Sequence, residues 1–520
     1  MPRGKSSIIN LKPYDQTQLL LLPPSFEEMI PEKHLVRVVN TMIDDLDLQI
    51  FLKSYKGGGT SVFHPKMMIK VIVYAYLNKI YTSRKIAKAL REDIHFMWLS
   101  GMQRPDFRTI NEFRSTRLKD IIDTVFAAQV EYLIENGYIR LDNYFVDGSK
   151  IEANANKYSH VWRKNVERYE TATKKKIRDL ISHIEKVNNT EQENYGNNDL
   201  EELGEGFVTD SEKLKKYIDT LKDQLSKKKQ AGSFGAAEKE TAKAVRNLEK
   251  EQLPKLEKYE QNRKDLGGRN SFSKTDKDAT FVRMKDGLLR PGYNVLIGCE
   301  KQFLINYSIH QNPGESGLFI PHMAKLNQLV GRLPKNAIAD SAFGSFENYE
   351  YLSAKGIGNY LKYNTFAQDL SSKTQSEKFS KHDFKYDESN DSLVCPKNEV
   401  LKPTRTRTRI SNNGYPQEVK IYECEQSADC PMSNKCILNR YKKLEYNRKL
   451  EVYKAAVYQS LTSYKGVNLR KQRCIEPETI FGDIKWNQKF TRFTLRGSEK
   501  VNIEMGILSL VHNFKKLFTC

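Results

Sequence analysis

The sequence predicts a mixed α/β fold, in which a mixed-sheet core is preceded by a helical N-terminal domain and interrupted by two insertions. Three observations support this prediction. Strand-like segments recur between residues 139 and 363 and alternate with helical patterns. Apolar residues repeat at helical spacing from Pro24 to about Leu133. Two polar stretches, 160–272 and 369–450, differ in composition from the segments around them.

The charge balance favours a polyanionic partner. The 520 residues include 85 Lys and Arg against 65 Asp and Glu, which gives a net charge of +20. Nucleic acid is the first candidate and an acidic membrane surface the second, although solvated lysine faces would give the same charge. No apolar run is long enough for a membrane span and no signal peptide is recognisable, so we expect a soluble, cytoplasmic protein. The seven cysteines, an odd number, argue against a disulfide framework.

The N-terminal domain, residues 1–135, contains two short basic helical segments at 82–90 and 106–114. Ser83 is a plausible N-cap of the first segment. Together with the break at 101–105, the pair is typical of a helix-turn-helix, which would place Arg84, Lys85 and Arg108 on DNA. A plain helical bundle has the same pattern, and both interpretations remain open.

The core is expected in three pieces, 136–159, 273–368 and 451–520. A strand from Ile139 to Val146 leads into Asp147, and a short strand at 336–340 ends in Asp340. Between them lie a strand at 279–284, a hairpin of strands at 293–299 and 303–309, and a helix at 318–333; a helix at 346–355 and a strand at 359–363 follow. This order fits an RNase H-like core, and acids at the ends of buried strands need a cation as partner.

The two insertions have different compositions. Residues 160–272 contain three apolar stripes at helical spacing in a Lys- and Glu-rich background, which indicates a helical arm. Residues 369–450 contain Cys395, Cys424, Cys430 and Cys436. Four thiols would stabilise such a polar segment by binding one structural Zn²⁺, but the tight C-x2-C pairs of a strong zinc signal are missing. Zinc and four separate reduced thiols therefore remain alternatives.

A third acid lies on a predicted helix near the C-terminus. Pro477 suits the start of a helix, which places Glu478 in the first turn and Lys485 two turns later on the same face. We expect this helix to continue into a basic run of Lys489, Arg492 and Arg496 that would contact phosphates. An ordinary surface helix is the alternative, and Glu476 competes with Glu478 for the role of the acid.

Several stretches together resemble the DDE transposases of bacterial insertion sequences, and most closely the IS1182-type group, which is related to the IS4 and IS5 groups. The matching stretches are Tyr144–Ala153, Ala279–Lys285, Pro291–Val295, Ala339–Asp340 with Gly344–Ser345, Phe481–Lys485, Arg492–Phe493 and Leu495–Gly497. The resemblance implies an RNase H-like core with Asp147, Asp340 and Glu478 as its acidic triad, and Arg473 and Lys485 as basic residues around the glutamate. Two departures are Ser341-Ala342-Phe343, where relatives usually have Ala-Gly-Tyr, and Leu469, near a position where IS4-like elements have Tyr.

The resemblance also implies cofactors and partners. A pair of Mg²⁺ or Mn²⁺ ions on the triad would support cleavage at the element ends and strand transfer of the 3′-OH. The partners would be double-stranded DNA, as terminal inverted repeats and target, and a second copy of the chain on paired ends; no membrane is involved, and the protein would be associated with the nucleoid. Two alternatives remain, a non-catalytic DNA-binding protein derived from a transposase and a metal-dependent nuclease without strand transfer.

Overall fold

The computed structural model describes residues 25–47, 49, 52, 62–195, 210–232, 234–371, 383–411, 414–424, 430, 436 and 443–519. The chain divides into two compact units, Met1–Phe113 with Phe518–Cys520, and Arg114–Leu517. Strands of one mixed sheet and helices make up the core of the second unit, and helices make up the described part of the first. The prediction of a mixed α/β protein with a mixed sheet and a helical N-terminal region is therefore confirmed.

The N-terminal unit is built around the apolar helix α4 (Pro65–Leu77), nearly all of which is buried. The other helices are α1 (Phe26–Met29), α2 (Leu35–Asp44), α5 (Ser83–Glu92), α6 (Ile94–Leu99) and α7 (Phe107–Ser115). Helix α5 is capped by Thr82, whose hydroxyl accepts from the Lys85 N–H, so the expected cap at Ser83 is one residue late. A further helix, α6, lies in the chain between the two basic segments, and Asp93 is its N-cap. The sequence predicted that the first basic segment leads directly to the break at 101–105.

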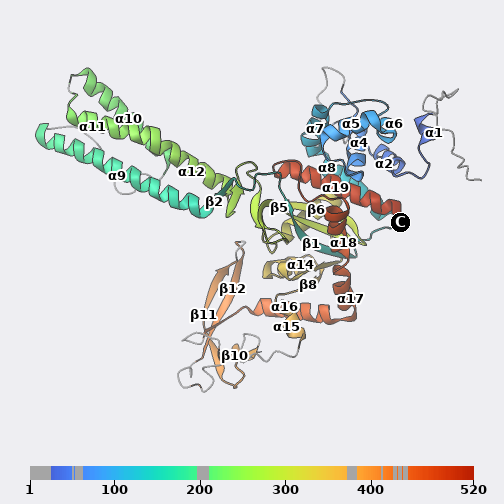
Figure 1. Ribbon diagram of the computed structural model, residues 1–520. Coiled ribbons are helices and arrows are strands. Elements are labelled where there is room, and N and C mark those ends of the chain that lie inside the picture. Colours follow the sequence, from blue (N-terminus) through green and yellow to red (C-terminus); the bar gives the residue numbers. More distant parts are fainter. Residues whose placement is uncertain are drawn as a thin grey trace, which may run out of the picture. The chain divides into compact units, whose positions relative to one another are not determined.

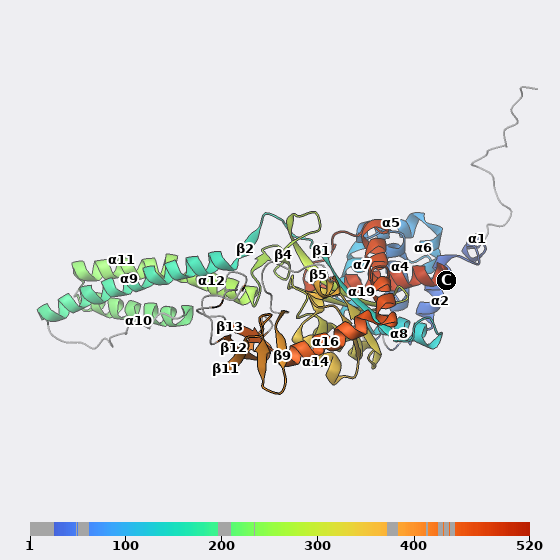
Figure 2. The same cartoon turned by 90° about the horizontal axis from the view of Figure 1, so that it is seen from below.

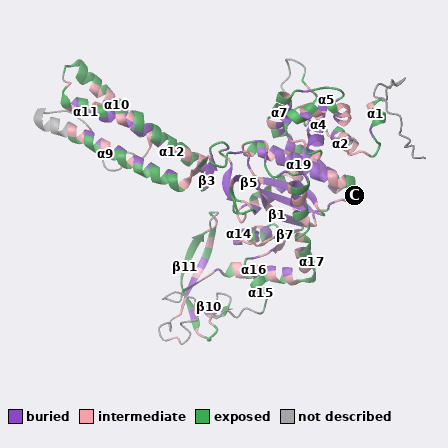
Figure 3. Cartoon of the chain, in the orientation of Figure 1, coloured by how far each residue is buried: buried purple, intermediate pink, exposed green. Residues whose placement is uncertain are grey.

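The central sheet has the strand order β4-β5-β1-β7-β8, with β6 paired to β5 (Figure 1). Its strands are β1 (Asn143–Glu152), β4 (Thr280–Arg283), β5 (Leu289–Glu300), β6 (Phe303–His310), β7 (Asn336–Ala339) and β8 (Gly358–Leu361). Strand β1 is antiparallel to β5 and parallel to β7, and β7 is parallel to β8. Most residues of β5, β6 and β7 are buried, as are most of those of β1 that precede Asp147 (Figure 3).

Strand β1 begins and ends later than predicted. The Glu300 carboxylate accepts hydrogen bonds from the N–H groups of residues 140 to 143 at 2.7–2.9 Å, which holds this segment in a turn. The strand then continues past Asp147 to Glu152, because the long strand β5 pairs with it over this whole length. Asp147 is therefore in the middle of a strand, and the prediction that it ends one was wrong.

The β5–β6 hairpin forms as predicted, with Lys301 and Gln302 both at positive φ in its two-residue turn. Gly292 lies inside β5. A Cβ atom there would come within 2.8 Å of the Ile151 carbonyl oxygen on β1. Glycine is thus needed for the close approach of the two strands.

Gly298 on β5 leaves room for a buried tyrosine of β1. A Cβ atom at Gly298 would lie 1.7 Å from the Tyr144 hydroxyl oxygen, and this hydroxyl is 2.8 Å from Nε2 of His322 on α13 (Phe319–Val330). We therefore expect Gly298→Ala to lower the free energy of unfolding by about 3 kcal/mol, because the ring must leave its packed position. Chemical denaturation of the full chain measures this, with Gly268→Ala as control because a Cβ at Gly268 meets nothing within 4 Å. Equal stability of the two variants would contradict the prediction.

The first insertion forms the helices α9 (Arg163–Tyr195), α10 (Ser211–Gln230), α11 (Ala236–Asn247) and α12 (Leu253–Leu266), with a π-helical turn, η2 (Leu248–Gln252), before α12. The helices lie side by side in both views (Figures 1 and 2). Their predicted stripes, represented by Ile181, Leu214 and Val245, meet in one apolar core. At the base, β2 (His160–Trp162) pairs with β3 (Ser271–Ser273), so the chain enters and leaves the bundle through adjacent strands.

The second insertion forms a separate five-stranded antiparallel sheet. Its strands are β9 (Lys385–Asp387), β10 (Ser392–Val394), β11 (Val400–Ile410), β12 (Pro416–Cys424) and β13 (Lys443–Tyr446). A small core of Phe384, Leu393, Leu401, Tyr422 and Leu444 lies on one face. This apolar cluster provides a core that the composition of the segment did not predict.

The remaining helices complete the second unit. They are η1 (Arg117–Asp120), α8 (Ile122–Glu135), η3 (Ser341–Phe343), α14 (Phe346–Ala354), α15 (Phe366–Leu370), α16 (Arg448–Thr462), α17 (Tyr464–Arg473), α18 (Glu476–Gly482), the π-helical turn η5 (Asp483–Asn487) and α19 (Ser498–Thr519). Helix α19 is largely buried. Among the described residues, none of the helices combines the length and the apolar character needed to cross a membrane.

Candidate active site

Asp147 and Asp340 converge because their strands are neighbours. The β1–β7 register pairs Phe145 with Ile338, so two residues further along, Asp147 is level with Asp340, directly after the end of β7. One nitrogen of the Arg473 guanidinium, at the end of α17, lies 3.4 Å from Oδ1 of Asp147 and 3.3 Å from Oδ2 of Asp340. The two carboxylates therefore share one cation that belongs to the protein itself.

Glu478 belongs to the same electrostatic environment. It lies in the first turn of α18, which packs against β1 and β5, and its side chain is exposed. Burial raises the pKa of Asp147, and the negative charges of Asp340 and Glu478 raise it further, while Arg473 and the Gly148 N–H act in the opposite direction. The charges of Asp340 and Glu478 thus both act on Asp147.

The competing acid, Glu476, has a different environment. Its carboxylate accepts a hydrogen bond from the Gln302 N–H in the β5–β6 turn, and burial raises its pKa. It therefore attaches α18 to the hairpin. The choice of Glu478 over Glu476 stays a prediction, but only Glu478 appears among the charges that act on Asp147.

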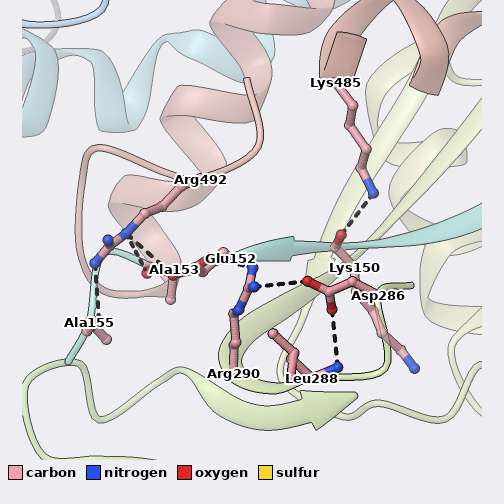
Figure 4. Close-up of polar contacts among 9 residues, drawn as sticks. All are labelled: Lys150, Glu152, Ala153, Ala155, Asp286, Leu288, Arg290, Lys485 and Arg492. Atoms are coloured by element: carbon pink, nitrogen blue, oxygen red, sulfur yellow. Dashed lines mark hydrogen bonds and ion pairs between the residues drawn. The ribbon is translucent and has the colours of Figure 1, made fainter. Parts of the chain in front are cut away.

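Lys485 contacts β1 next to the aspartate. Its ammonium donates to the Ser149 hydroxyl at 2.6 Å. It also donates to the Lys150 carbonyl at 2.8 Å (Figure 4). Burial, with the charge of Lys285, lowers the pKa of Lys485 to about 8. The lysine therefore holds the second half of β1 in place, and its ammonium is directed at the strand.

The basic run after Lys485 is not helical, contrary to our prediction. The π-helical turn η5 ends at Asn487, Lys489 has a φ of 55°, and Arg492 forms a β-bridge with Glu152. The Arg492 guanidinium donates to the carbonyls of Ala153 and Ala155 (Figure 4). Arg496 donates to the Asn154 carbonyl at 2.7 Å, and Lys489 is exposed.

The predicted DNA contacts of the N-terminal unit lie at its surface. Arg84, Lys85 and Arg108 are exposed. The guanidinium carbons of Arg84 and Arg108 lie 5.1 and 5.8 Å from the centre of the Phe107 ring. Arg84 and Arg108 are therefore both adjacent to Phe107, whose ring is partly exposed.

The four cysteines of the second insertion are of intermediate exposure. Cys395, Cys424 and Cys436 pack around the small apolar core of that sheet. In the described ranges, no group of three His, Cys, Asp or Glu side chains is close enough to hold a metal ion, so these residues do not form the zinc site that was one of the two alternatives. The physical reason is that the small core already packs three of the thiols.

In the described residues, Asp147, Asp340 and Glu478 likewise do not form a group that could hold a metal ion. The Arg473 guanidinium lies between the two aspartates. The donor set nevertheless suits a divalent ion, since carboxylate oxygens are the ligands that Mg²⁺ prefers, and two of them already face a cation. The Nε of Arg473 is buried and has no hydrogen-bond partner among the residues described. The Nε–H group of Arg473 thus makes no hydrogen bond that stabilises the described part of the fold.

Our reading of the sequence missed two charged residues of this centre. Glu315 lies in the loop between β6 and α13, and burial, with the charges of Asp340 and Asp147, raises its pKa to about 7. Lys362 directly follows β8, and burial, with the charge of Arg473, lowers its pKa. Lys362 follows the end of a strand, which is the signal that identified Asp340 and could have identified it, whereas Glu315 lies further along its loop and has no such signal.

Two family models match the sequence. A transposase domain (DUF772) matches residues 24–116, and a transposase DDE domain matches residues 394–518. The second match contains Glu478 and Arg473, while Asp147 and Asp340 lie outside both. Among curated proteins, none matches the sequence.

Proposed function

We propose, on the premise that this chain belongs to the DDE transposases and is consistent with the IS1182 type, that it cuts the ends of an insertion sequence and joins the freed 3′-OH to target DNA. The observation that carries the proposal is the single guanidinium of Arg473 held by both Asp147 and Asp340. Carboxylates that converge on one cation, with Glu478 adding its charge, favour binding of divalent cations.

The sheet supports an RNase H-like assignment of the core. Strands β6, β5 and β1 are antiparallel neighbours, and β7 and β8 continue on the other side of β1 in parallel. One acid lies on the central strand, one follows the adjacent strand, and one lies on a C-terminal helix that packs on β1. The sequence predicted the same order of elements, but with Asp147 at the end of its strand rather than in the middle.

Asp147, Asp340 and Glu478 are the residues proposed to hold Mg²⁺ or Mn²⁺, which when bound supplies positive charge for activating the nucleophile and stabilising the leaving oxygen. The side chains around them have separate tasks. Arg473 presents a guanidinium fork that matches a phosphate, and its uncommitted Nε is a further donor. Lys485 fixes the strand next to Asp147 through Ser149 and the Lys150 carbonyl.

The proposed reaction consists of two phosphoryl transfers. A water oxygen attacks the phosphorus at the element end, the bond from phosphorus to the 3′ oxygen breaks, and that oxygen leaves as a hydroxyl. The 3′-OH then attacks a phosphodiester of the target, so that one P–O bond forms and one breaks. No covalent bond between protein and DNA is needed, and the acids and Arg473 serve both steps.

Binding of DNA is proposed to involve two groups of basic residues. Arg84, Lys85 and Arg108 form the exposed group of the N-terminal unit. Lys489 and Arg496 follow the Glu478 helix and are also exposed. Contacts from such residues to phosphates position a duplex without reading its sequence. A homodimer would hold the two element ends together.

A strand-transfer assay tests the proposal. The full chain, Mg²⁺ and a pre-cut terminal repeat with a free 3′-OH are incubated with a plasmid, and joined product is measured on a gel. We expect joining that is lost when the 3′ end is a dideoxynucleotide. Cutting of uncut ends without joining would favour a nuclease, and end binding without either reaction would favour a non-catalytic DNA-binding protein.

A further inference from the structure

The loop between β6 and α13 brings a fourth carboxylate to the aspartate pair. A Cβ atom placed on Gly148 would lie 2.8 Å from Oε1 of Glu315 and 2.9 Å from its carboxyl carbon. Gly148 directly follows Asp147 on β1, and successive side chains of a strand point to opposite faces. The Glu315 carboxylate therefore reaches the strand on the face opposite to the Asp147 side chain, in space that only glycine leaves open.

The fold places this carboxylate near two acids without giving it a compensating contact. The charges of Asp340 and Asp147 both act on Glu315, and the nearest opposing charges are those of Lys150 and Arg473. Across the described residues, no hydrogen bond or ion pair of its carboxylate is found, although the side chain is half-buried. Half-buried carboxylates that repel each other destabilise a chain unless a cation compensates them.

We propose that Glu315, from the face of β1 opposite to the Asp147 side chain, raises through its charge the affinity of the Asp147–Asp340 centre for divalent cations, and that Gly148 is required because it makes room for the Glu315 carboxylate. This inference rests on the proposed function, since it assigns Glu315 to the same cation centre. It extends the acidic triad by a residue that acts on the ion through charge and position.

The Gly148 contact provides a direct structural test. In Gly148→Ala the new methyl group would overlap the end of the Glu315 side chain, which is flexible enough to move away. The carboxylate would then be displaced at little cost in stability. If Glu315 is already replaced by glutamine, the same methyl group should have little further effect on cation binding, because no charge remains to be displaced.

The experiment measures Mn²⁺ binding to the full chain by electron paramagnetic resonance, together with the shift in melting temperature that Mn²⁺ causes. The variants are Glu315→Gln, Gly148→Ala, their combination and Asp147→Asn, with Glu257→Gln on the exposed face of α12 as control. We expect Glu315→Gln and Gly148→Ala each to weaken Mn²⁺ binding by about 10-fold, the size seen when groups that support a metal site are removed. The combination should be no weaker than Glu315→Gln alone.

Without metal, Glu315→Gln should melt at the same temperature as the wild type or higher, because it removes a repulsive charge. A role in stability alone predicts a lower melting temperature and unchanged Mn²⁺ affinity, and that result would overturn the inference. If Asp147→Asn weakens Mn²⁺ binding while Glu315→Gln does not, the inference fails and the proposed active site stands. If the wild type does not bind Mn²⁺, or Asp147→Asn binds it equally well, the proposed site itself fails.

Discussion

Replacing Asp147 by asparagine is expected to abolish cleavage of terminal-repeat DNA, with a loss of at least about 10³-fold in rate. Asparagine keeps the shape of the side chain but removes one of the two charges that face Arg473. Asp340→Asn should have the same effect for the same reason. The measurement is cleavage of a labelled end in Mg²⁺, with binding of the same DNA followed by mobility shift.

End binding should remain within a few-fold of wild type for both variants, because the proposed DNA contacts are made by basic residues elsewhere. Asp286→Asn is a matched control, since Asp286 is an exposed acid in the turn before β5, where it pairs with Arg290 (Figure 4). Cleavage by Asp147→Asn at the rate of this control would exclude Asp147 from the active site.

Replacing Asp483 by alanine is expected to lower the free energy of unfolding by about 2–4 kcal/mol. Its carboxylate connects η5 to α19, since it accepts from Lys515 at 2.7 Å and Gln488 at 2.7 Å and lies 3.3 Å from Nδ1 of His512. The substitution would remove the carboxylate that these three side chains contact. Thermal melting at neutral pH measures the effect, with Asp286→Ala as the control for loss of a surface acid.

The same residue gives a pH dependence. Burial alone would raise the pKa of Asp483, but the hydrogen bonds from His512, Lys515 and Gln488 lower it well below the usual range. A carboxyl whose pKa is lower in the folded state stabilises the fold above the unfolded pKa of about 3.9, and this stabilisation is lost as pH falls. Wild type should therefore lose more stability than Asp483→Ala between about pH 5 and pH 2. If wild type and Asp483→Ala lose the same stability over this pH range, Asp483 is not the source of the pH dependence.

Several elements were predictable because their signals are local. The β5–β6 hairpin, the strand before Asp340 and the apolar stripes of α9 to α12 follow from alternation, turn residues and helical spacing. The limits of β1 and the end of the Glu478 helix were not, since the first depends on how far β5 extends and on the Glu300 carboxylate. The second depends on a π-helical turn and on the β-bridge of Arg492 with Glu152.

The sequence by itself determined the class of elements, their order and the positive charge, because these depend on side-chain type and spacing. The choice of Asp147, Asp340 and Glu478 as the acidic triad came from the family resemblance and stays a prediction. Only the tertiary structure decided which groups meet. The parallel register of β1 and β7 brings Asp147 level with Asp340, and Arg473 at the end of α17 contacts both. Gly148, which has no side chain, leaves room for the Glu315 carboxylate. The physical reason is that strand pairing and helix docking join segments far apart in the chain, and no local pattern records those contacts.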